Sequence, residues 1–244
     1  MINQNLIFDL GMSEGNDTAY YLAKGFSVVG VEADPVICVA LRNRFAHEIA
    51  AGRLDLFNAA AFHTAGMAVD LWRNDAAQGT SSLRKSNKAQ FADSQRSFSV
   101  KTVDWPTLVT KHGVPRYCKI DIEGGEIDFL KSVSGAEALP PYMSAESKTL
   151  EPIVALHELG YRHFKLVDQG AVRSFPICNP PLEGTYVPKP DWRHTSGPFG
   201  RELPGPAWLS FNEIKDLFQT LLEIKRHRTV GWTWYDCHAA IEVD

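Results

Sequence analysis

Along the first 168 residues, short apolar runs alternate with segments whose apolar side chains recur every three or four positions. Runs that are apolar on both faces are typical of strands buried inside a sheet. Six runs are predicted as such strands: residues 6–10, 27–31, 54–62, 117–122, 142–147 and 162–168. Because helical segments separate the strands, we expect parallel pairing and right-handed crossovers. The pattern predicts an α/β protein with a mainly parallel sheet and helices on both faces.

Capping residues mark several predicted helix starts. Asp34 followed by Pro35 is an N-cap with proline in the first helical position. Thr149 is expected to cap a later helix. Ser210 and Glu213 have the spacing of a capping box and stand before an amphipathic stretch. The sequence therefore predicts helices that begin at these three places.

Two regions interrupt the alternation. Strand-like runs at 67–72 and 98–103 flank a polar, serine-rich stretch at 74–96, which indicates a hairpin-like excursion with a mobile tip. Residues 170–209 hold 8 of the 14 prolines, and loops of this length are usually functional. After a helix, residues 232–243 are predicted as one long strand. We expect a single domain over 1–244 that carries a proline-rich insertion at about 170–209.

Composition and charge narrow the class of protein. Hydrophobic residues make up 44% of the 244 residues and charged residues 22%, which is close to the globular average. The net charge of −4 disfavours a nucleic-acid partner. No run approaches the roughly 18 apolar residues of a membrane span, and the first residues lack the features of a signal peptide. The four cysteines are widely spaced, which argues against a zinc site or a disulfide framework. We expect a cytoplasmic protein without a membrane partner.

The first candidate for chemistry is the loop between the first strand and the first helix, which contains Gly11 and Gly15. Glycines there let the backbone approach a ligand, and the helix N-terminus offers free N–H groups. The alternative is a plain strand–helix turn. Glu32 ends the second strand, where an acidic side chain can bind both hydroxyls of a ribose. The alternative for Glu32 is a solvated strand end.

The second candidate is the acidic segment that follows the strand at 117–122. Asp121 ends an otherwise buried strand, and Glu123 and Glu126 follow it beside two glycines. Ligands of open α/β sheets bind at the carboxyl ends of the strands, so these acids indicate a crevice. The alternative is that Glu123 and Glu126 only favour the N-terminal dipole of the next helix.

Three of these segments together resemble the FkbM-type methyltransferase family: IFDLGMSEGNDT at 7–18, VEADP at 31–35 and KIDIEGGE at 119–126. Residues 102–104 and 144–146 are also similar to the family pattern. The resemblance covers about residues 6–168. It implies a class I Rossmann-like fold and S-adenosylmethionine as methyl donor. It further implies O-methylation of a hydroxyl on a small molecule or glycan, which would be the acceptor.

The resemblance also implies a donor site spread over four strand ends. Asp9, Gly11 and Gly15 would form the pocket for the amino-acid part of the donor, with Asp17 and Thr18 at its helix edge, Glu32 at the ribose, Asn58 and Ala59 beside the adenine, and Asp121 facing the cationic sulfonium.

Methyl transfer to an alcohol releases a proton, so a general base or a metal is expected. Asp121, Glu123 and Glu146 are the catalytic candidates, since their strand ends should converge. A divalent ion such as Mg²⁺ could bridge the same carboxylates, because oxygen ligands suit magnesium. His238 is a further candidate base, and a structural histidine in a terminal strand is its alternative.

The insertion at 170–209 is a candidate acceptor lid. Its aromatic and cationic side chains suit stacking on a sugar or a planar substrate. These residues are Trp192, Arg193, His194, Phe199 and Arg201. The alternative is a loop that is pinned by its own aromatic residues.

Two other functions are compatible with an α/β fold. A nicotinamide-dependent oxidoreductase is disfavoured because the G-x-G-x-x-G fingerprint is absent. A non-catalytic nucleoside-binding module would keep the pocket without the chemistry.

Overall fold

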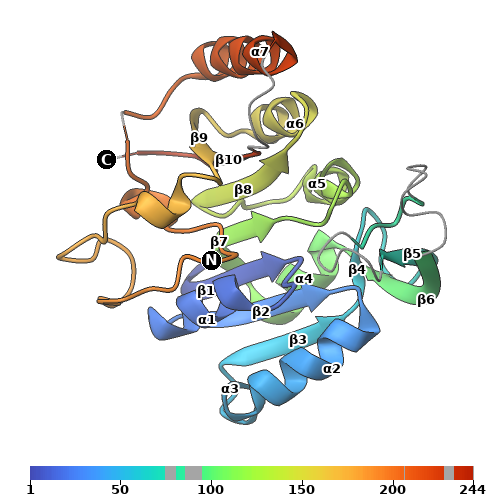
Figure 1. The fold of residues 1–244 in the computed structure, drawn as a ribbon. Helices are drawn as coiled ribbons and strands as arrows, with labels where there is room; N and C mark the ends of the chain where they lie inside the picture. The colour runs from blue at the N-terminus through green and yellow to red at the C-terminus, as the bar shows by residue number, and fades with distance from the viewer. Residues whose placement is uncertain (75–80, 86–94, 206, 228–233, 244) are drawn as a thin grey trace.

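A computed structural model describes residues 1–74, 81–85, 95–205, 207–227 and 234–243 of the chain (Figure 1). Its main sheet has the strand order β3-β2-β1-β7-β8-β10-β9. The strands are β1 (Ile2–Leu10), β2 (Ser27–Glu32), β3 (Leu54–Asn58), β7 (Val114–Ile120), β8 (Tyr142–Ser147), β9 (His163–Asp168) and β10 (Tyr235–Ala240). Only β10 runs antiparallel to its neighbours β8 and β9. The predicted mainly parallel sheet is confirmed.

Helices cover both faces of this sheet, as the sequence predicts. The first group is α1 (Asn16–Ala23), α2 (Pro35–Arg44) and α3 (Ala46–Ala50), and the second is α4 (Trp105–His112), α5 (Glu126–Val133), α6 (Glu151–Leu159) and α7 (Phe211–His227). Neighbouring residues of β1 pack alternately against the first and the second group of helices. Ile7 packs in one apolar cluster with Tyr21 of α1, whereas Phe8 packs in another with Trp105 of α4. This alternation follows from the two-residue period of a strand.

The chain leaves the main sheet after Asn58 and builds a second, smaller sheet. It contains β4 (Ala60–Ala61), β5 (Ala68–Asn74) and β6 (Gln95–Val103), in the order β4-β6-β5. The predicted single strand at 54–62 is therefore wrong. The Asn58 side chain donates to the backbone oxygens of Glu32 and Ala33, and these bonds turn the chain away from β2. The predicted hairpin is confirmed as the antiparallel β5–β6 pair, while residues 75–80 and 86–94 of its tip lie outside the described residues.

The helix starts follow the predicted caps in two of three cases. The Asp34 carboxylate accepts from the backbone N–H groups of Val36 and Ile37. Ser210 and Glu213 form the reciprocal bonds of a capping box. Thr149 is not a cap, because α6 begins at Glu151 with Leu150 at the N-cap and no side-chain cap bond.

The strand predicted at 232–243 is shorter in the structure. Within the described residues, β10 covers only Tyr235–Ala240. Residues 232 and 233 lie outside the described part of the chain.

The proline-rich insertion covers the part of the sheet that α1 and α2 leave open (yellow-orange to orange in Figure 1). It contains two short 3₁₀ turns, η2 (Val172–Ser174) and η3 (Gly200–Glu202). Phe199 is fully buried and stacks on Tyr117 of β7, with ring centroids 4.7 Å apart. It also meets Tyr21 and Phe26 edge-on. The insertion therefore completes the core on this face. In the described part of the chain, no helix combines the length and apolar character needed to cross a membrane.

Candidate functional site

The predicted site residues gather at the carboxyl edge of the main sheet. Asp9 lies near the end of β1, beside Lys119 of β7 in the strand register. Asp121 follows the last residue of β7, and Glu146 stands near the end of β8. The hairpin reaches the same edge, since the Ser82 hydroxyl donates to the backbone oxygen of Glu123 at 2.9 Å. The expected convergence of strand ends is therefore present.

A buried lysine lies at the centre of this edge. The amine of Lys119, which is 3% exposed, lies 3.6 Å from Asp9, 3.3 Å from Asp17 and 3.4 Å from Asp121. Thr18 donates a 2.6 Å hydrogen bond to Asp9. Burial raises the pKa of Asp9, and it raises the pKa of Asp17 to about 6. Burial lowers the pKa of Lys119, but the surrounding carboxylates outweigh it, so the pKa is raised well above its ordinary value.

Lys119 has no role in the site predicted from the sequence. The sequence feature that could have identified Lys119 is its position inside an apolar strand, two residues before an acid. A buried ammonium requires charged partners, so this pattern indicates nearby carboxylates.

The glycines of the first loop are required by close packing. Gly11 has a φ of 84°, and a Cβ there would lie 1.7 Å from the backbone oxygen of Asp121. Gly15 has a φ of 79°, and its Cβ would meet Leu41 and Phe45 of the α2 region. Gly11 thus lets the loop touch β7, while Gly15 seats α1 against α2. The alternative of a turn that needs glycine accounts for much of this spacing.

Glu32 joins the loops that follow β1 and β2. Its carboxylate accepts from the backbone N–H of Ser13 at 2.9 Å and of Asp34 at 2.8 Å. Burial raises its pKa to about 7. The backbone N–H of the buried Ala59 donates to the Glu32 carbonyl. Each carboxylate oxygen has a second lone pair, so Glu32 can accept from a ligand as well.

Asp121, Glu123 and Glu146 form a compact group of carboxylates. One oxygen from each lies within 4.8 Å of the others. Lys148 already lies 2.9 Å from Glu123 and 2.7 Å from Glu146. Burial, followed by the charge of Asp121, raises the pKa of Glu146 to about 7. The Lys148 ammonium lies against two of the three carboxylates, where a divalent ion would have to displace it, so the group fits a resident metal site poorly.

The Glu126 side chain stabilises the backbone of the loop that joins β7 to α5. Its carboxylate accepts from the backbone N–H groups of Ile122 and Gly124. This arrangement favours the structural alternative for Glu126 over a binding role.

Two polar residues of β10 face the same side of the sheet. Asp236 pairs with Glu146 in the strand register, and His238 pairs with Ser144. Burial lowers the pKa of His238 to about 3, and its ring lies parallel to Tyr117 at 6.2 Å. A neutral, buried imidazole fits the structural alternative better than a general base. Asp236 is absent from the site predicted from the sequence.

The predicted acceptor lid is mostly a packed structural element. Phe199 belongs to the core, and Trp192 packs edge-on against Tyr20 at 4.9 Å. Arg193 pairs with its neighbour Asp191. The alternative of a loop pinned by its own aromatic residues is therefore correct for both aromatic side chains. His194 has a φ of 53° and stands beside the buried Thr195.

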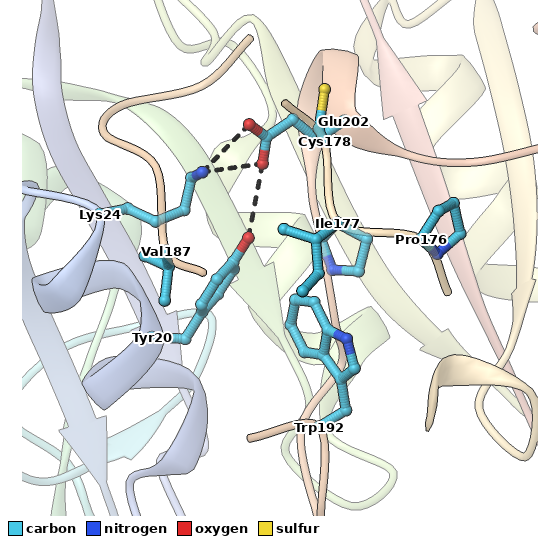
Figure 2. A pocket seen from close by; sticks show the side chains of 9 residues that line it. Tyr20, Lys24, Pro176, Ile177, Cys178, Val187, Trp192 and Glu202 are labelled. Atoms are coloured by element: carbon cyan, nitrogen blue, oxygen red, sulfur yellow. Dashed lines mark hydrogen bonds and ion pairs between the residues drawn. The ribbon is translucent and has the colours of Figure 1, made fainter. Parts of the chain in front are cut away.

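A polar seam joins the insertion to α1. Figure 2 shows Tyr20 of α1 and Lys24, which follows this helix, directed at the carboxylate of Glu202. The Tyr20 hydroxyl lies 3.4 Å and the Lys24 amine 2.8 Å from that carboxylate. The cavity beside them has a volume of about 10 Å³, room for one water molecule at most. This pocket lies between α1 and the insertion, and none of the strand-end acids described above lines it. The insertion does reach that edge at Ser196, whose backbone N–H donates to Asp17 at 2.8 Å.

Three non-glycine residues with left-handed backbone occur in the described part of the chain: Ser13, Glu123 and His194. Each belongs to a segment that touches the acidic edge. Such strained residues cluster at functional sites. Together with the buried charges, they make this edge the candidate ligand-binding site, since open α/β sheets bind ligands at the carboxyl ends of their strands.

Comparison with known proteins gives the family. The model of the methyltransferase FkbM domain matches residues 9–165. The chain therefore belongs to the FkbM methyltransferase family, and the predicted family and the predicted Rossmann-like α/β fold are confirmed. No curated protein sequence matches the chain.

Solved methyltransferase structures show distant similarity. Methyltransferase FkbM from Methylobacillus flagellatus KT is 17% identical, with a TM-score of 0.39 over 60% of this chain and 34% of that chain. This chain thus spans about a third of the length of that relative. The C-terminal domain of precorrin-6Y C5,15-methyltransferase from Rhodobacter capsulatus is 12% identical, with a TM-score of 0.43 over 98% and 80%. The METTL16 methyltransferase domain is 8% identical, with a TM-score of 0.42 over 100% and 61%.

Proposed function

We propose that this chain transfers the methyl group of S-adenosylmethionine to a hydroxyl oxygen of a small molecule or glycan. The observation that carries the proposal is the gathering of strand-end carboxylates around two lysines at one sheet edge. Lys119 is shared by three carboxylates and Lys148 by two. Most of these residues lie in the segments that resemble the family motifs.

The donor site takes residues from the ends of four strands. The loop after β1 is shaped by Asp9, Gly11 and Gly15, and the start of α1 contributes Asp17 and Thr18. Glu32 binds the ribose, and the adenine lies between Asn58 and Ala59. Asp121 faces the sulfonium. When bound, S-adenosylmethionine supplies a methyl group activated by a positively charged sulfur. A carboxylate favours a cationic group beside it. The half-buried Asp121 side chain therefore contributes to donor affinity.

Glu146 is the best candidate for the general base. A base works best when its pKa lies near the ambient pH, and burial raises the pKa of Glu146 to about 7. Lys148 holds its carboxylate in place, and Glu123 holds Lys148 from the other side. The acceptor oxygen attacks the methyl carbon, the carbon–sulfur bond breaks, and the hydroxyl proton passes to Glu146. Orientation in such a site contributes about 7–11 kcal/mol toward the barrier.

Calorimetry tests the donor site. The protein is titrated with S-adenosylmethionine and with each nicotinamide nucleotide, in the native form and as Glu32→Gln. Donor binding is expected only with S-adenosylmethionine, with a loss of about tenfold or more in Glu32→Gln, as for a lost hydrogen bond to a charged group. The exposed Glu137→Gln variant is the matched control. Binding of a nicotinamide nucleotide instead would replace the proposal with the oxidoreductase alternative.

A methyl-transfer assay tests the chemistry. Labelled donor is incubated with a panel of hydroxyl-bearing small molecules and glycans, and the products are analysed for methyl ethers. Glu146→Gln is expected to lower the rate by about 10²–10⁴-fold with donor affinity unchanged. A product methylated on nitrogen or carbon would contradict the O-directed reaction while leaving the class of enzyme intact.

A further inference from the structure

The order of strands divides the crevice into two halves. Most of the proposed donor residues lie at the ends of β1, β2 and β3, which form one side of the sheet, and Asp121 follows the central strand β7. On the other side of β7, the crevice is bordered by β8 and β10, which contribute Glu146 and Asp236. If the donor binds over the first half, the acceptor lies over the second. The inference below rests on the proposed function for this division.

Asp236 is a buried carboxylate without a partner. It is 3% exposed, and it accepts no hydrogen bond and forms no ion pair with any residue that the structure describes. Glu146 lies directly opposite it on the neighbouring strand. Burial, followed by the charge of Asp121, raises the pKa of Asp236 well above its ordinary value, while Lys119 opposes the shift. The Asp236 carboxylate therefore faces the acidic group of the crevice, and a buried carboxylate without a partner is costly. The carboxyl group is therefore neutral until a cation binds beside it.

No nearby cation is directed at Asp236. Lys165 of β9 lies opposite His238, but its amine donates to the backbone oxygens of Leu203 and Pro204. His238 itself is neutral, because burial lowers its pKa to about 3. Among the described residues, the remaining positive charges of this region are Lys119 and Lys148, which already face other carboxylates.

Two further buried atoms on this side have no partner among the residues that the structure describes. They are Nε2 of His238 and the hydroxyl oxygen of Thr195. Thr195 precedes Ser196, whose backbone N–H binds Asp17. The insertion thus brings a polar atom to the edge that also carries Asp236. Buried polar atoms without partners indicate that a polar ligand belongs there.

The crevice also has an excess of negative charge. Six carboxylates act on one another or share a lysine there: Asp9, Asp17, Asp121, Glu123, Glu146 and Asp236. Two lysines oppose them, Lys119 and Lys148. The carboxyl groups therefore outnumber the ammonium groups by 6 − 2 = 4, and several of them hold a proton in the free protein because their pKa is raised. A site with this balance attracts cations and repels anionic acceptors.

We propose that Asp236 and Glu146 form an acceptor subsite that binds a protonated amine, so that the acceptor is an amine-bearing hydroxyl compound such as an amino sugar. An ammonium group has three donors and no acceptor. The subsite provides acceptors and no donors, because an ionised carboxylate accepts hydrogen bonds and donates none. The ammonium also supplies the counter-charge that Asp236 lacks. A phosphorylated or carboxylated acceptor has neither property.

The test compares two sugars that differ in one charge. The protein is titrated with glucosamine and with N-acetylglucosamine at about pH 7.5, which lies above the pKa of about 7 of Glu146 and just below the ordinary range of an amine beside a hydroxyl-bearing carbon. Each titration is run with and without saturating S-adenosylhomocysteine, the uncharged product of the donor. The variants are Asp236→Asn, the charge-preserving Asp236→Glu and the exposed control Asp70→Asn. Near-ultraviolet circular dichroism checks the fold of each variant.

Glucosamine is expected to bind about tenfold or more tightly than N-acetylglucosamine, as for a hydrogen bond between charged groups. Asp236→Asn should abolish this preference, whereas Asp236→Glu and Asp70→Asn should keep it. Equal affinities in the native protein, or an unchanged preference in Asp236→Asn, would overturn the subsite. The native comparison decides the question even if Asp236→Asn does not fold.

The product arm separates this inference from the proposed function. A preference for the amine without any binding of S-adenosylhomocysteine would support the subsite and contradict the donor site. Binding of S-adenosylhomocysteine without a preference for the amine would do the opposite.

Discussion

Replacing Lys119 by methionine removes the shared counter-charge of the crevice. The methionine side chain has a similar length and no charge, so the change leaves the space filled. Asp9 and Asp17 then remain in the interior without their ammonium neighbour, and Asp121 loses it as well. Removing one partner of a buried ion pair typically costs about 3–5 kcal/mol. We expect a loss of that size in the free energy of unfolding at about pH 8.

The structure also predicts how this loss depends on pH. The pKa of Asp17 is raised from 3.8 to about 6 even with Lys119 in place, a shift that corresponds to about 3 kcal/mol. A carboxylate whose pKa is raised on folding destabilises the protein above the folded pKa, and this cost disappears below the unfolded pKa. Without Lys119 the pKa of Asp17 rises further. The difference between native and Lys119→Met that comes from Asp17 should therefore grow above about pH 6 and disappear as the pH falls through about 6, where Asp17 is protonated in both proteins.

Urea unfolding at a series of pH values measures this difference. Lys131→Met is the matched control, because Lys131 forms an exposed pair with Asp128 on the surface of α5. Its loss should stay below about 0.5 kcal/mol at every pH. A stable Lys119→Met variant at about pH 8, or a loss that does not shrink on acidification, would refute the assignment of Lys119 as the shared counter-charge.

Three further outcomes are expected. Phe199→Ala should lower the free energy of unfolding by about 3–5 kcal/mol, as for a truncated core aromatic. The control Tyr186→Ala removes an exposed ring and should change this free energy by about 0.5 kcal/mol or less. A similarly small loss in both variants would mean that the insertion is not part of the core. The pKa of Glu32 is raised to about 7, so donor affinity measured by calorimetry should fall below that pH, where the carboxylate is protonated. The Glu32→Gln variant should bind the donor weakly at every pH. A donor affinity of the native protein that does not change with pH would contradict the ribose role of Glu32. A chelator should leave methyl transfer unchanged, because Lys148 already pairs with both Glu123 and Glu146. A loss of activity that Mg²⁺ restores would show that a metal displaces the ammonium.

The parts of the site that follow parallel strands were predictable from the sequence. Asp9 and Asp121 each stand at the end of an apolar run, and the carboxyl ends of parallel strands meet at one edge. The pattern of apolar residues did not predict that both carboxylates would lie beside the amine of Lys119. The proposed roles in donor binding and catalysis remain predictions.

The parts that depend on distant residues were not predictable. Asp236 reaches the crevice only because β10 lies antiparallel between β8 and β9, and no local pattern indicates that position. Ala59 and Ala60 continue an apolar run, so periodicity predicts one strand where the side-chain bonds of Asn58 divide it. Phe199 is aromatic in a polar loop, and its burial against Tyr117 depends on a contact between residues that are 199 − 117 = 82 positions apart in the sequence.

The position of β10 has a consequence for the order in which the chain can fold. In the described structure, β9 pairs with no strand except β10, and β10 comes later in the chain than both of its neighbours. A growing chain that has produced β9 and α7 therefore cannot attach β9 to the sheet until residues 235–240 have also emerged. Loops that must close over such distances slow folding. Until then β8 has an open edge, and the acidic edge of the crevice lacks Asp236, so the acceptor half of the site is among the last parts of the molecule to form.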